Sequence, residues 1–240
     1  MSQAPEAKGR INSPEAFQEA FGVSRETLDR LRTYEGLLKA WQKAVNLVSP
    51  STLDQVWHRH FADSAQLFAL AGFNSASPSR PHEGGEESQG GKNWLDLGSG
   101  GGFPGLVLAI LLAERLPAAR MTLVESDARK AAFLGEVARK TGLVVEIRVE
   151  RSEKTATQAN SVSSDVITAR ALAPLPKLLG LAQPFFSPHT VALFPKGREA
   201  ELEVEEARER FEFDFSLAPS LTDDEARIVI VRNLAARTEG

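Results

Sequence analysis

Apolar residues in roughly the first seventy positions recur every three or four residues, which is the spacing of one face of an α-helix. Ser13 and Ser24 each stand where a serine can cap the first turn of a helix. Residues 46–50 break the pattern, and a further helix is expected over 52–70. We therefore predict that residues 1–71 form a helical cap whose apolar stripe packs against the next part of the chain. The stripe after Ser24 comprises Leu28, Leu31, Tyr34, Leu37, Leu38 and Trp41.

From Trp94 onward, short apolar runs alternate with longer amphipathic segments. This alternation is typical of a parallel β-sheet with helices crossing over its faces. The last two apolar runs have no helix between them, so they are expected to end the sheet as an antiparallel pair. The sequence thus predicts an α/β fold, Rossmann-like, with a mostly parallel seven-stranded sheet and an antiparallel last strand. The expected strands are 94–97, 121–125, 144–149, 165–169, 190–194, 211–217 and 226–233, and the expected helices lie near 105–114, 128–141, 174–181 and 199–210.

Residues 72–93 separate these two parts and are rich in Ser, Pro, Gly and Glu, with almost no apolar side chains. Such a segment cannot bury enough surface to offset the entropy that it would lose on ordering. We expect a flexible insertion there and assign it no function. The expected organisation is a helical cap over 1–71, this insertion over 72–93, and a ligand-binding catalytic domain over 94–240.

A glycine-dense turn follows the first expected strand and precedes the first helix of the α/β part, with the sequence Asn93-Trp94-Leu95-Asp96-Leu97-Gly98-Ser99-Gly100-Gly101-Gly102-Phe103-Pro104-Gly105. Glycine lacks a Cβ, so the backbone can bend sharply here and approach a ligand closely. The helix N-terminus beyond it favours an electronegative group. Asp96 with the glycines at 98, 100 and 102 matches the D-x-G-x-G-x-G turn of Rossmann-like methyltransferases. We interpret the turn as a binding site for S-adenosylmethionine, with Asp96, Gly98 and Gly100 as candidate contacts.

Two other interpretations of this turn stay open. Gly100, Gly102 and Gly105 also fit G-x-G-x-x-G, the fingerprint of NAD and FAD sites, or the turn serves the fold alone. In a dinucleotide site, the leading glycine closely follows the strand, and the helix receives a pyrophosphate. Here the expected strand ends near Leu97, and Asp96 would lie close to the phosphates. An acid suits the cationic methionine end of the methyl donor better, so the methyl-donor interpretation is favoured.

Composition excludes several kinds of chemistry. The chain of 240 residues has no cysteine, which excludes disulfides, a cysteine nucleophile and thiolate metal ligands, and its four histidines are too scattered for a convincing metal site. No apolar stretch reaches the roughly 18–20 residues of a membrane span, and the polar N-terminus lacks a signal region. We therefore expect a cytoplasmic protein with no metal cofactor and no membrane partner.

Charge is unevenly distributed along the chain. The formal net charge is −4, yet residues 92–198 contain fourteen basic and nine acidic side chains, whereas residues 199–225 contain two basic and eleven acidic ones. A locally basic surface suits a polyanionic substrate. We interpret the acidic run 199–212 as the solvated face of a helix.

Polar residues follow several of the expected strands, and ligands of open parallel sheets bind outside these carboxyl ends. Glu125 is placed to accept hydrogen bonds from the ribose hydroxyls of an adenosine, unless it caps the next helix. Glu153 borders the expected adenine site. Arg170 is a candidate to anchor a substrate phosphate or a guanine edge, or to border the donor, unless it pairs structurally with Asp165 or Glu153. Lys196 is a candidate phosphate contact, unless its loop is simply solvated.

The expected helix over 52–70 contains a cluster of polar residues. Arg59 and Asp63 are four residues apart, so they can form an ion pair along one helix face; closing over the donor pocket is the alternative. His58 and His60 are two residues apart and cannot share a face, which makes metal binding by this pair improbable.

Together these motifs resemble a known family. The matching elements are Asn46-Leu47, Arg59-His60 with Asp63-Ser64, the loop from Leu95 to Gly105, Arg129-Lys130 with Phe133-Leu134, Arg170-Ala171 and Lys196-Gly197. In this order they resemble the family first called glucose-inhibited division protein B, the small-subunit (16S) ribosomal RNA guanine-N7 methyltransferases, over about residues 24–233. Three positions depart from a common form of the pattern: Arg129-Lys130 stands where Lys-Arg is frequent, and Ala169 where serine is frequent.

The resemblance implies a class I methyltransferase fold, S-adenosyl-L-methionine as methyl donor, and ribosomal RNA of the small subunit as partner; we expect a monomer. It also implies donor contacts at Gly98, Phe103, Ser152, Glu153 and Arg170.

The implied reaction needs no general base. Guanine N7 has an in-plane lone pair and attacks a sulfonium methyl without prior deprotonation, so alignment and desolvation matter most. We therefore assign no catalytic residue and name Arg59, His60, Arg170 and Lys196 as candidates to align the substrate. An NAD(P)-binding oxidoreductase and a non-catalytic, donor-bound RNA-binding module remain the alternatives.

Overall fold

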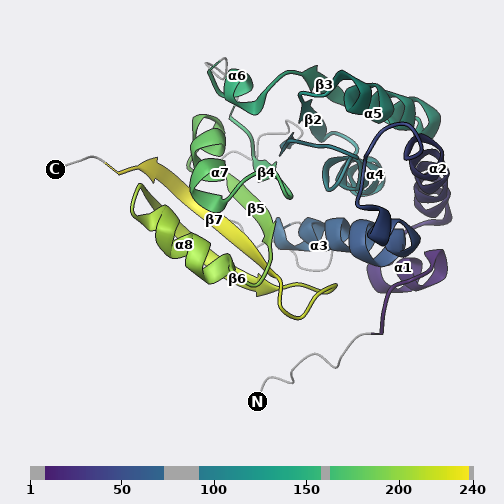
Figure 1. The fold of residues 1–240 in the computed structure, drawn as a ribbon, viewed down its shortest axis with the longest axis horizontal. Coiled ribbons are helices and arrows are strands. Elements are labelled where there is room, and N and C mark those ends of the chain that lie inside the picture. The colour runs from purple at the N-terminus through teal and green to yellow at the C-terminus, as the bar shows by residue number, and fades with distance from the viewer. Residues whose placement is uncertain (1–8, 73–91, 158–162, 238–240) are drawn as a thin grey trace.

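The structure is a computed structural model that describes residues 9–72, 92–157 and 163–237. Helices and strands alternate from β1 to β6, as the sequence pattern predicts (Figure 1). In chain order the elements are α1 (Pro14–Phe21), α2 (Arg25–Trp41), η1 (Pro50–Gln55), η2 (Trp57–Ala62), α3 (Asp63–Leu70), β1 (Asn93–Leu97), α4 (Gly105–Arg115), β2 (Arg120–Glu125), α5 (Ala128–Thr141), β3 (Glu146–Val149), α6 (Ser152–Thr157), β4 (Val166–Thr168), α7 (Leu175–Ala182), η3 (Gln183–Phe185), β5 (Val191–Lys196), α8 (Ala200–Arg208), β6 (Phe211–Pro219) and β7 (Arg227–Ala236).

The strands form one seven-stranded sheet in the order β3-β2-β1-β4-β5-β7-β6. The strands from β1 to β5 pair in parallel, whereas β7 pairs antiparallel with both β5 and β6. The predicted Rossmann-like fold with an antiparallel last strand is therefore confirmed. Strand order reverses between β1 and β4, and the carboxyl ends of strands at such a switch point are where ligands of α/β sheets bind.

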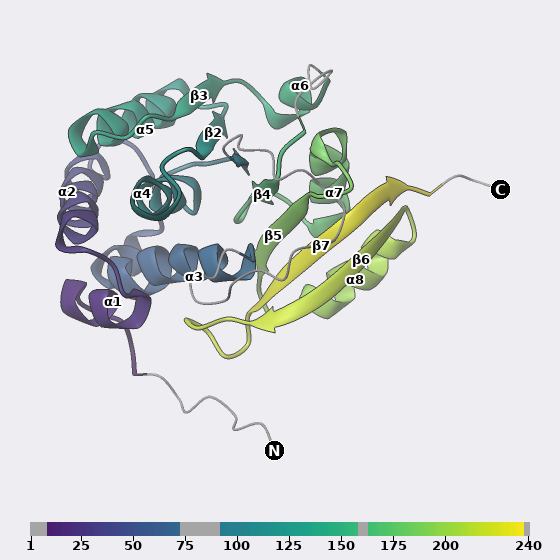
Figure 2. The same ribbon diagram turned by 180° about the vertical axis from the view of Figure 1, so that it is seen from behind.

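Both faces of the sheet are covered by helices, so its central strands are apolar on both sides. On β5, Val191 and Leu193 join the core on one face, while Ala192 and Phe194 join the core on the other. The face of Leu193 is covered by the N-terminal helices with α4 and α5, and the face of Phe194 is covered by α7 and α8 (Figures 1 and 2).

The N-terminal helices share one apolar core with this side of the sheet. Tyr34 of α2 and Phe61 of η2 are fully buried and belong to the same cluster as Leu106 of α4 and Phe133 of α5. Ser13 and Ser24 cap α1 and α2 as predicted, each by accepting a hydrogen bond from a backbone N–H of the first turn. Burial of these helices against α4 and α5 stabilises the glycine turn, because the turn lies between β1 and α4.

Two local predictions were wrong, and one short helix was not predicted. Residues 52–70 form no single helix, because a 3-10 helix (η1), a π-helical segment (η2) and α3 follow one another. Most residues of η2 are buried, so the spacing of its apolar residues does not mark a single buried helix face. The polar segment Ser152–Thr157 forms the short helix α6, which has no apolar stripe to predict it, and β3 begins at Glu146 rather than Val144. The insertion expected over 72–93 lies almost entirely outside the described residues, and Asn93 belongs to β1.

Candidate functional site

A cavity of about 450 Å³ lies at the carboxyl ends of β1 to β4. This volume is within the range of about 300–1,000 Å³ that small-molecule sites occupy. We call it the donor cavity, after the methyl donor that the sequence analysis expects there. Its wall combines the glycine turn with residues that follow the next strands, among them Gly98 to Gly101, Phe103, Glu125, Lys130, Ser152, Glu153 and Arg170 to Ala173.

The glycine turn brings main chain, rather than side chains, to the wall of the donor cavity. Gly98 has φ +69° and Gly102 has φ +90°, conformations that side-chain-bearing residues rarely adopt. A Cβ at Gly98 would lie 2.6 Å from Leu172 Cδ1, and a Cβ at Gly102 would collide with the Tyr34 hydroxyl oxygen. That hydroxyl donates a hydrogen bond to the main-chain oxygen of Gly101. Glycine is thus required both by the backbone conformation and by the space around it.

Asp96 lies behind the turn and is not part of the cavity wall. Its side chain is fully buried, and its Oδ1 accepts a hydrogen bond from the Thr168 hydroxyl at 2.7 Å, while its Oδ2 accepts one from the Gly105 N–H at 3.2 Å. Burial raises the pKa of this carboxyl to about 6, although the hydrogen bonds from Thr168 and Gly105 oppose the shift. Asp96 therefore joins β1 and β4 to the start of α4, and the structure does not bring it to the position of the expected donor contact.

Glu125 lies on the cavity wall and is held rigidly. Its Oε2 accepts a hydrogen bond from the Gly100 N–H at 2.8 Å, and its Oε1 accepts one from the Asp127 N–H at 2.7 Å. The cap of α5 is Asp127, which accepts from the N–H groups of Arg129 and Lys130, so the alternative that Glu125 caps this helix is wrong. Each carboxylate oxygen can accept further hydrogen bonds, which leaves Glu125 able to accept from a ligand hydroxyl.

Ser152 and Glu153 begin α6 at the opposite side of the donor cavity. Ser152 is buried, whereas Glu153 is exposed and pairs with Lys177 of α7 at 3.5 Å. Phe103, at the end of the glycine turn, is nearly fully buried and stacks between Tyr34 and His60. The structure therefore gathers Gly98, Gly100, Phe103, Glu125, Ser152, Glu153 and Arg170 around one cavity.

Arg170 links the donor cavity to the N-terminal helices. Its Nη1 lies 2.9 Å from Asp63 Oδ2 and 3.1 Å from the main-chain oxygen of Arg59, and its Nη2 lies 2.9 Å from His60 Nδ1. The guanidinium also stands over the Phe103 ring, 5.2 Å from its centre. The expected alternative, a pair with Asp165 or Glu153, was wrong.

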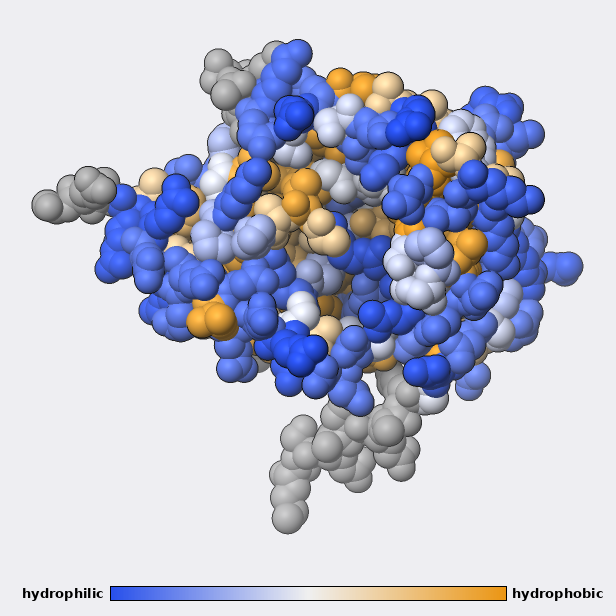
Figure 3. All heavy atoms as spheres, viewed as in Figure 1, coloured by the Kyte–Doolittle hydropathy of each residue, from blue (hydrophilic) through white to orange (hydrophobic). Residues whose placement is uncertain are grey.

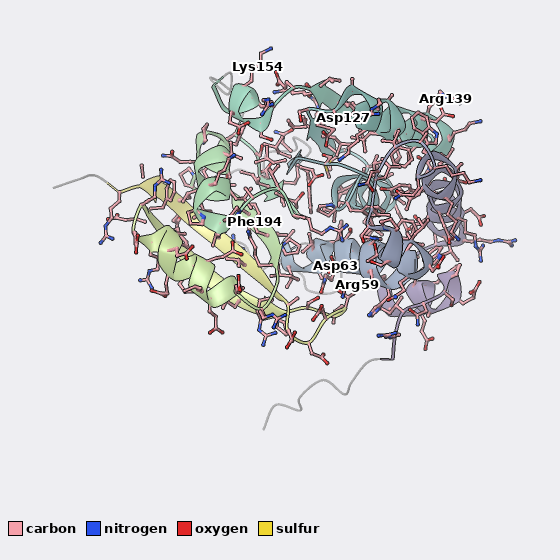
Figure 4. The ribbon with its side chains drawn as sticks, in the orientation of Figure 1. Arg59, Asp63, Asp127, Arg139, Lys154 and Phe194 are labelled. Atoms are coloured by element: carbon pink, nitrogen blue, oxygen red, sulfur yellow. The ribbon has the colours of Figure 1, made fainter. Side chains whose placement is uncertain are left out.

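Arg59 and Asp63 lie close together where η2 meets α3 (Figure 4), yet they do not pair with each other as expected. Arg59 Nη1 lies 3.0 Å from Asp223 Oδ2, in the loop between β6 and β7. Asp63 uses its other oxygen to accept from the hydroxyl of Thr222, in the same loop, at 2.8 Å. These partners lie far away in the sequence, so helix spacing did not indicate them.

The network fixes the protonation of His60. A guanidinium only donates, so His60 Nδ1 accepts from Arg170 and the ring proton is on Nε2, which donates to the Thr52 hydroxyl at 2.9 Å. Thr52 in turn donates to the main-chain oxygen of Ser49 at 2.8 Å. Burial, together with the nearby charges of Arg170 and Arg59, lowers the pKa of His60 to about 3. His60 is therefore neutral at physiological pH, with both nitrogens engaged.

A second cavity, of about 780 Å³, adjoins the donor cavity. The two share Leu47 and the segment Arg170 to Ala173 in their walls. The remaining wall of the second cavity comes from η1, η2, the end of β5, and the loop between β6 and β7, with Arg59, His60, Asp63, Lys196 and Asp223 among its residues. The face of the molecule in Figure 3 is hollowed near its middle, where hydrophilic residues surround apolar ones.

Lys196 lies in this second wall but is not a freely solvated side chain. Its Nζ lies 2.8 Å from the main-chain oxygen of Ala173 and 2.8 Å from Glu203 Oε2, and the side chain is 10% exposed. The alternative of a solvated loop is wrong for this residue. Sequence reasoning missed two supporting residues: Tyr34 belongs to an apolar pattern, and Glu203 is one of many acids in a run.

Within the described parts of the chain, no group of three or more His, Cys, Asp or Glu residues could hold a metal ion. The helices over these same residues lack the length and apolar character that crossing a bilayer requires.

The fold and the donor cavity define a class I, Rossmann-like methyltransferase. Among solved structures, the chain is similar in fold to an O-methyltransferase from Bacillus cereus in complex with SAH, with a TM-score of 0.57 and 15% identity over 92% of this chain and 96% of that chain. It is also similar in fold to a mutant of MtNAS in complex with S-adenosylmethionine, with a TM-score of 0.51 and 15% identity over 94% of this chain and 86% of that chain.

The chain belongs to the rRNA small subunit methyltransferase G (GidB) family, whose model matches residues 27–227. It is 47% identical to the ribosomal RNA small subunit methyltransferase G of Parvibaculum lavamentivorans over 94% of this chain and 91% of that protein. It is 48% identical to the protein of the same name from Rhodospirillum centenum over 92% and 91%. The family resemblance found in the motifs is confirmed. The family is one of S-adenosylmethionine-dependent rRNA methyltransferases, so the alternative of a dinucleotide-binding enzyme is wrong.

Proposed function

We propose that this protein transfers the methyl group of S-adenosyl-L-methionine to N7 of a guanine in small-subunit ribosomal RNA. The observation that supports this most directly is the pair of adjoining cavities, one with the glycine turn in its wall and the other with several charged side chains in its wall, which share the segment Arg170 to Ala173. A methyl donor in the first cavity and a nucleobase in the second would meet along that shared wall.

The residues of the donor cavity fit S-adenosylmethionine. The main chain of Gly98 to Gly101 leaves room that a Cβ would fill, Glu125 is held ready to accept from ribose hydroxyls, and Ser152 and Glu153 border the far side, where the adenine would lie. Arg170 and Phe103 close the side toward the second cavity. When bound, the donor supplies an electrophilic methyl group. The chain supplies the shape and the exclusion of water.

The second cavity suits a reaction that depends on alignment. Guanine N7 attacks without losing a proton, so the enzyme gains most from holding it in line with the methyl group. His60 is neutral, its pKa lies near 3, and both of its ring nitrogens already have partners. Its role in this proposal is to orient Arg170, which faces both cavities. Arg59, with a side chain 40% exposed, is placed to contact a substrate phosphate.

The absence of a metal cofactor, a monomeric state and a cytoplasmic location belong to the same proposal as predictions. An analytical ultracentrifugation run on the purified protein, alone and with donor, tests the monomer. Transfer that is unchanged by a strong chelator tests the independence from metal.

One experiment tests the function as a whole. Purified protein is incubated with labelled S-adenosylmethionine and small-subunit RNA, either naked or assembled into the subunit, and the modified nucleotide is mapped by mass spectrometry. We expect one methyl group on N7 of a guanine. Donor binding without any transfer to either substrate would favour a non-catalytic RNA-binding module. Tight NADH binding without donor binding would contradict the proposal entirely.

A further inference from the structure

Lys196 and Glu203 form a mostly buried ion pair that holds two points of one short segment. Lys196 Nζ donates to the main-chain oxygen of Ala173 at 2.8 Å and to Glu203 Oε2 at 2.8 Å. The same Oε2 accepts from the Leu175 N–H at 2.6 Å. The two side chains are 10% and 21% exposed. The pair thus binds one carbonyl of the loop that leads from β4 into α7, and the N–H group of the first residue of α7.

This loop is the wall that the two cavities share. Ala171, Leu172 and Ala173 line both of them. Ala171 has φ +54°, in the left-handed region that residues with a Cβ rarely occupy. Such a conformation persists only where the surrounding structure holds it in place. Arg170 is fixed from one side by Asp63 and His60, and the ion pair fixes the segment two residues beyond Ala171. The loop is therefore held at both ends.

Glu203 is less exposed than the other acidic residues of α8. Its neighbours Glu201, Glu205 and Glu206 are exposed, as expected for a solvated acidic face, whereas Glu203 is turned inward. A phosphate contact by Lys196, which the sequence suggested, would have to compete with Glu203 and with the Ala173 carbonyl for the same ammonium group. The contacts of Lys196 point to a role within the protein.

We propose that Lys196 and Glu203 are positioning residues, which hold the 170–175 loop so that the donor methyl and the substrate nucleophile are aligned across it. The proposal rests on the proposed function, because that function supplies the reaction that the loop would align. The contacts of the ion pair with the loop do not depend on it. Neither side chain needs to touch the substrate. Removal of either side chain should therefore slow methyl transfer without lowering the affinity for RNA.

The test compares Lys196→Met, Glu203→Ala and the double variant with the wild type, with Glu205→Ala as the matched control on the exposed face of α8. Hydrogen–deuterium exchange of the peptide that covers 170–176 reports on the loop. Filter binding of small-subunit RNA over a range of salt concentrations reports on phosphate contacts. Single-turnover transfer at saturating donor and RNA reports on alignment. Glu203→Gln, which keeps one acceptor, replaces Glu203→Ala if the latter does not unfold cooperatively.

We expect both single variants to exchange faster in this peptide and to transfer the methyl group about 10- to 100-fold more slowly, which is the size of effect that small misalignment produces. RNA affinity and its salt dependence should match those of the wild type, and the double variant should be no slower than the slower single variant.

If Lys196→Met instead weakens RNA binding and lowers the salt slope by about one, while Glu203→Ala does not, Lys196 is a phosphate contact and the proposal is overturned. It is equally overturned if exchange of 170–176 is unchanged in both variants. A wild type that methylates another atom, or none, contradicts the proposed function, while the exchange measurement still decides whether the pair holds the loop.

Discussion

The donor cavity and the second cavity differ in the sequence distance between the residues that hold their walls in place. One wall of the donor cavity is the main chain of one continuous turn. Two side chains support this turn: Glu125 accepts from the Gly100 N–H across 25 residues, and Tyr34 donates to the Gly101 oxygen across 67 residues. The wall of the second cavity combines apolar residues with charged side chains. The partners of these charged side chains lie far apart in the sequence, 164 residues for Arg59 and Asp223 and 159 for Asp63 and Thr222.

This difference determines how each cavity should respond to change. A wall of main chain tolerates no added atom, and its backbone conformation is held by close packing, so single substitutions there should act on donor binding and on stability. A wall of paired charged side chains tolerates changes in shape, but each side chain holds its partner in place. Substitutions there should therefore disturb the alignment of the substrate with the donor. Comparing donor binding with transfer rate therefore separates the two regions.

The largest effect is expected at Gly102 in the turn. In Gly102→Ala the new Cβ would collide with the Tyr34 hydroxyl and lie 2.6 Å from Leu106 Cδ1, in a backbone conformation with φ +90°. Left-handed strain of about 1 kcal/mol and overpacking of about 1–3 kcal/mol should add, and donor binding should be lost to calorimetric detection. Chemical denaturation measures the change in the free energy of unfolding.

Gly142→Ala is the matched control for this prediction. Gly142 has φ +68°, but a Cβ there would meet nothing within 4 Å. Its free energy of unfolding should fall by about 1 kcal/mol from backbone strain alone, with donor affinity intact. Equal losses in the two variants would show that backbone strain, rather than the packed turn, explains the requirement for glycine.

A smaller effect on stability, but a large one on transfer, is expected for Arg170→Ala. The change leaves Asp63 and His60 without their shared partner, and breaking a pair that is mostly buried, with side chains 18% and 16% exposed, should cost about 2–3 kcal/mol of stability. Transfer should fall by about 100-fold because the substrate loses its alignment. Donor titration and single-turnover rates separate the two effects.

Arg139→Ala controls for the loss of a positive charge, because Arg139 lies on α5 away from both cavities (Figure 4) and its side chain is 64% exposed. We expect it to transfer at the rate of the wild type. An Arg170→Ala variant that binds donor poorly but transfers normally when saturated would mean that Arg170 belongs to the donor cavity alone.

A more modest effect is expected for Glu125→Gln. The amide keeps one acceptor but replaces the other by a donor, so either the Gly100 N–H or the Asp127 N–H loses its partner. We expect donor affinity to fall by about 10-fold, the equivalent of about 1.4 kcal/mol, while the rate at saturating donor stays the same. Glu136→Gln, on the exposed side of α5, is the control. A reduced rate with unchanged donor affinity would exclude Glu125 from donor binding.

The same contrast explains how much of the molecule could be predicted from the sequence. The glycine turn and the strand that precedes it are contiguous, and their apolar and glycine patterns report local geometry directly. Glu125 could be placed because the carboxyl ends of β1 and β2 are neighbours in any such sheet. These predictions depend on a periodicity of a few residues and on the rules for parallel sheets.

The partners in the second cavity could not be predicted in this way. Helix spacing allows Arg59 to pair with Asp63, but the π-helical turn of η2 and the loop between β6 and β7 give Arg59 another acceptor, Asp223. The glycine motif indicates a donor contact at Asp96, but the fold turns this side chain inward to Thr168 and Gly105. Each of these contacts depends on which segments the tertiary fold brings together, and no local pattern encodes that.

The smallest expected effect concerns the pH dependence of stability and tests whether His60 is neutral. The pKa of His60 is lowered to about 3 in the folded protein, from an ordinary value of 6.5, so the unfolded chain takes up a proton first as the pH falls. The stabilisation that neutral His60 contributes is present above pH 6.5 and is lost on acidification, with a limiting slope of about 1.4 kcal/mol per pH unit.

The variant His60→Gln retains an acceptor for Arg170 and a donor for Thr52 but does not titrate. Between about pH 7 and pH 5.5, the free energy of unfolding of the wild type should therefore fall by about 1 kcal/mol more than that of the variant. Taking this difference cancels the opposite contribution of Asp96, whose raised pKa favours the folded state in acid. A difference that does not change with pH would mean that His60 is as readily protonated in the folded protein as in the unfolded chain, and Arg170 would then lack the neutral acceptor that orients it between the two cavities.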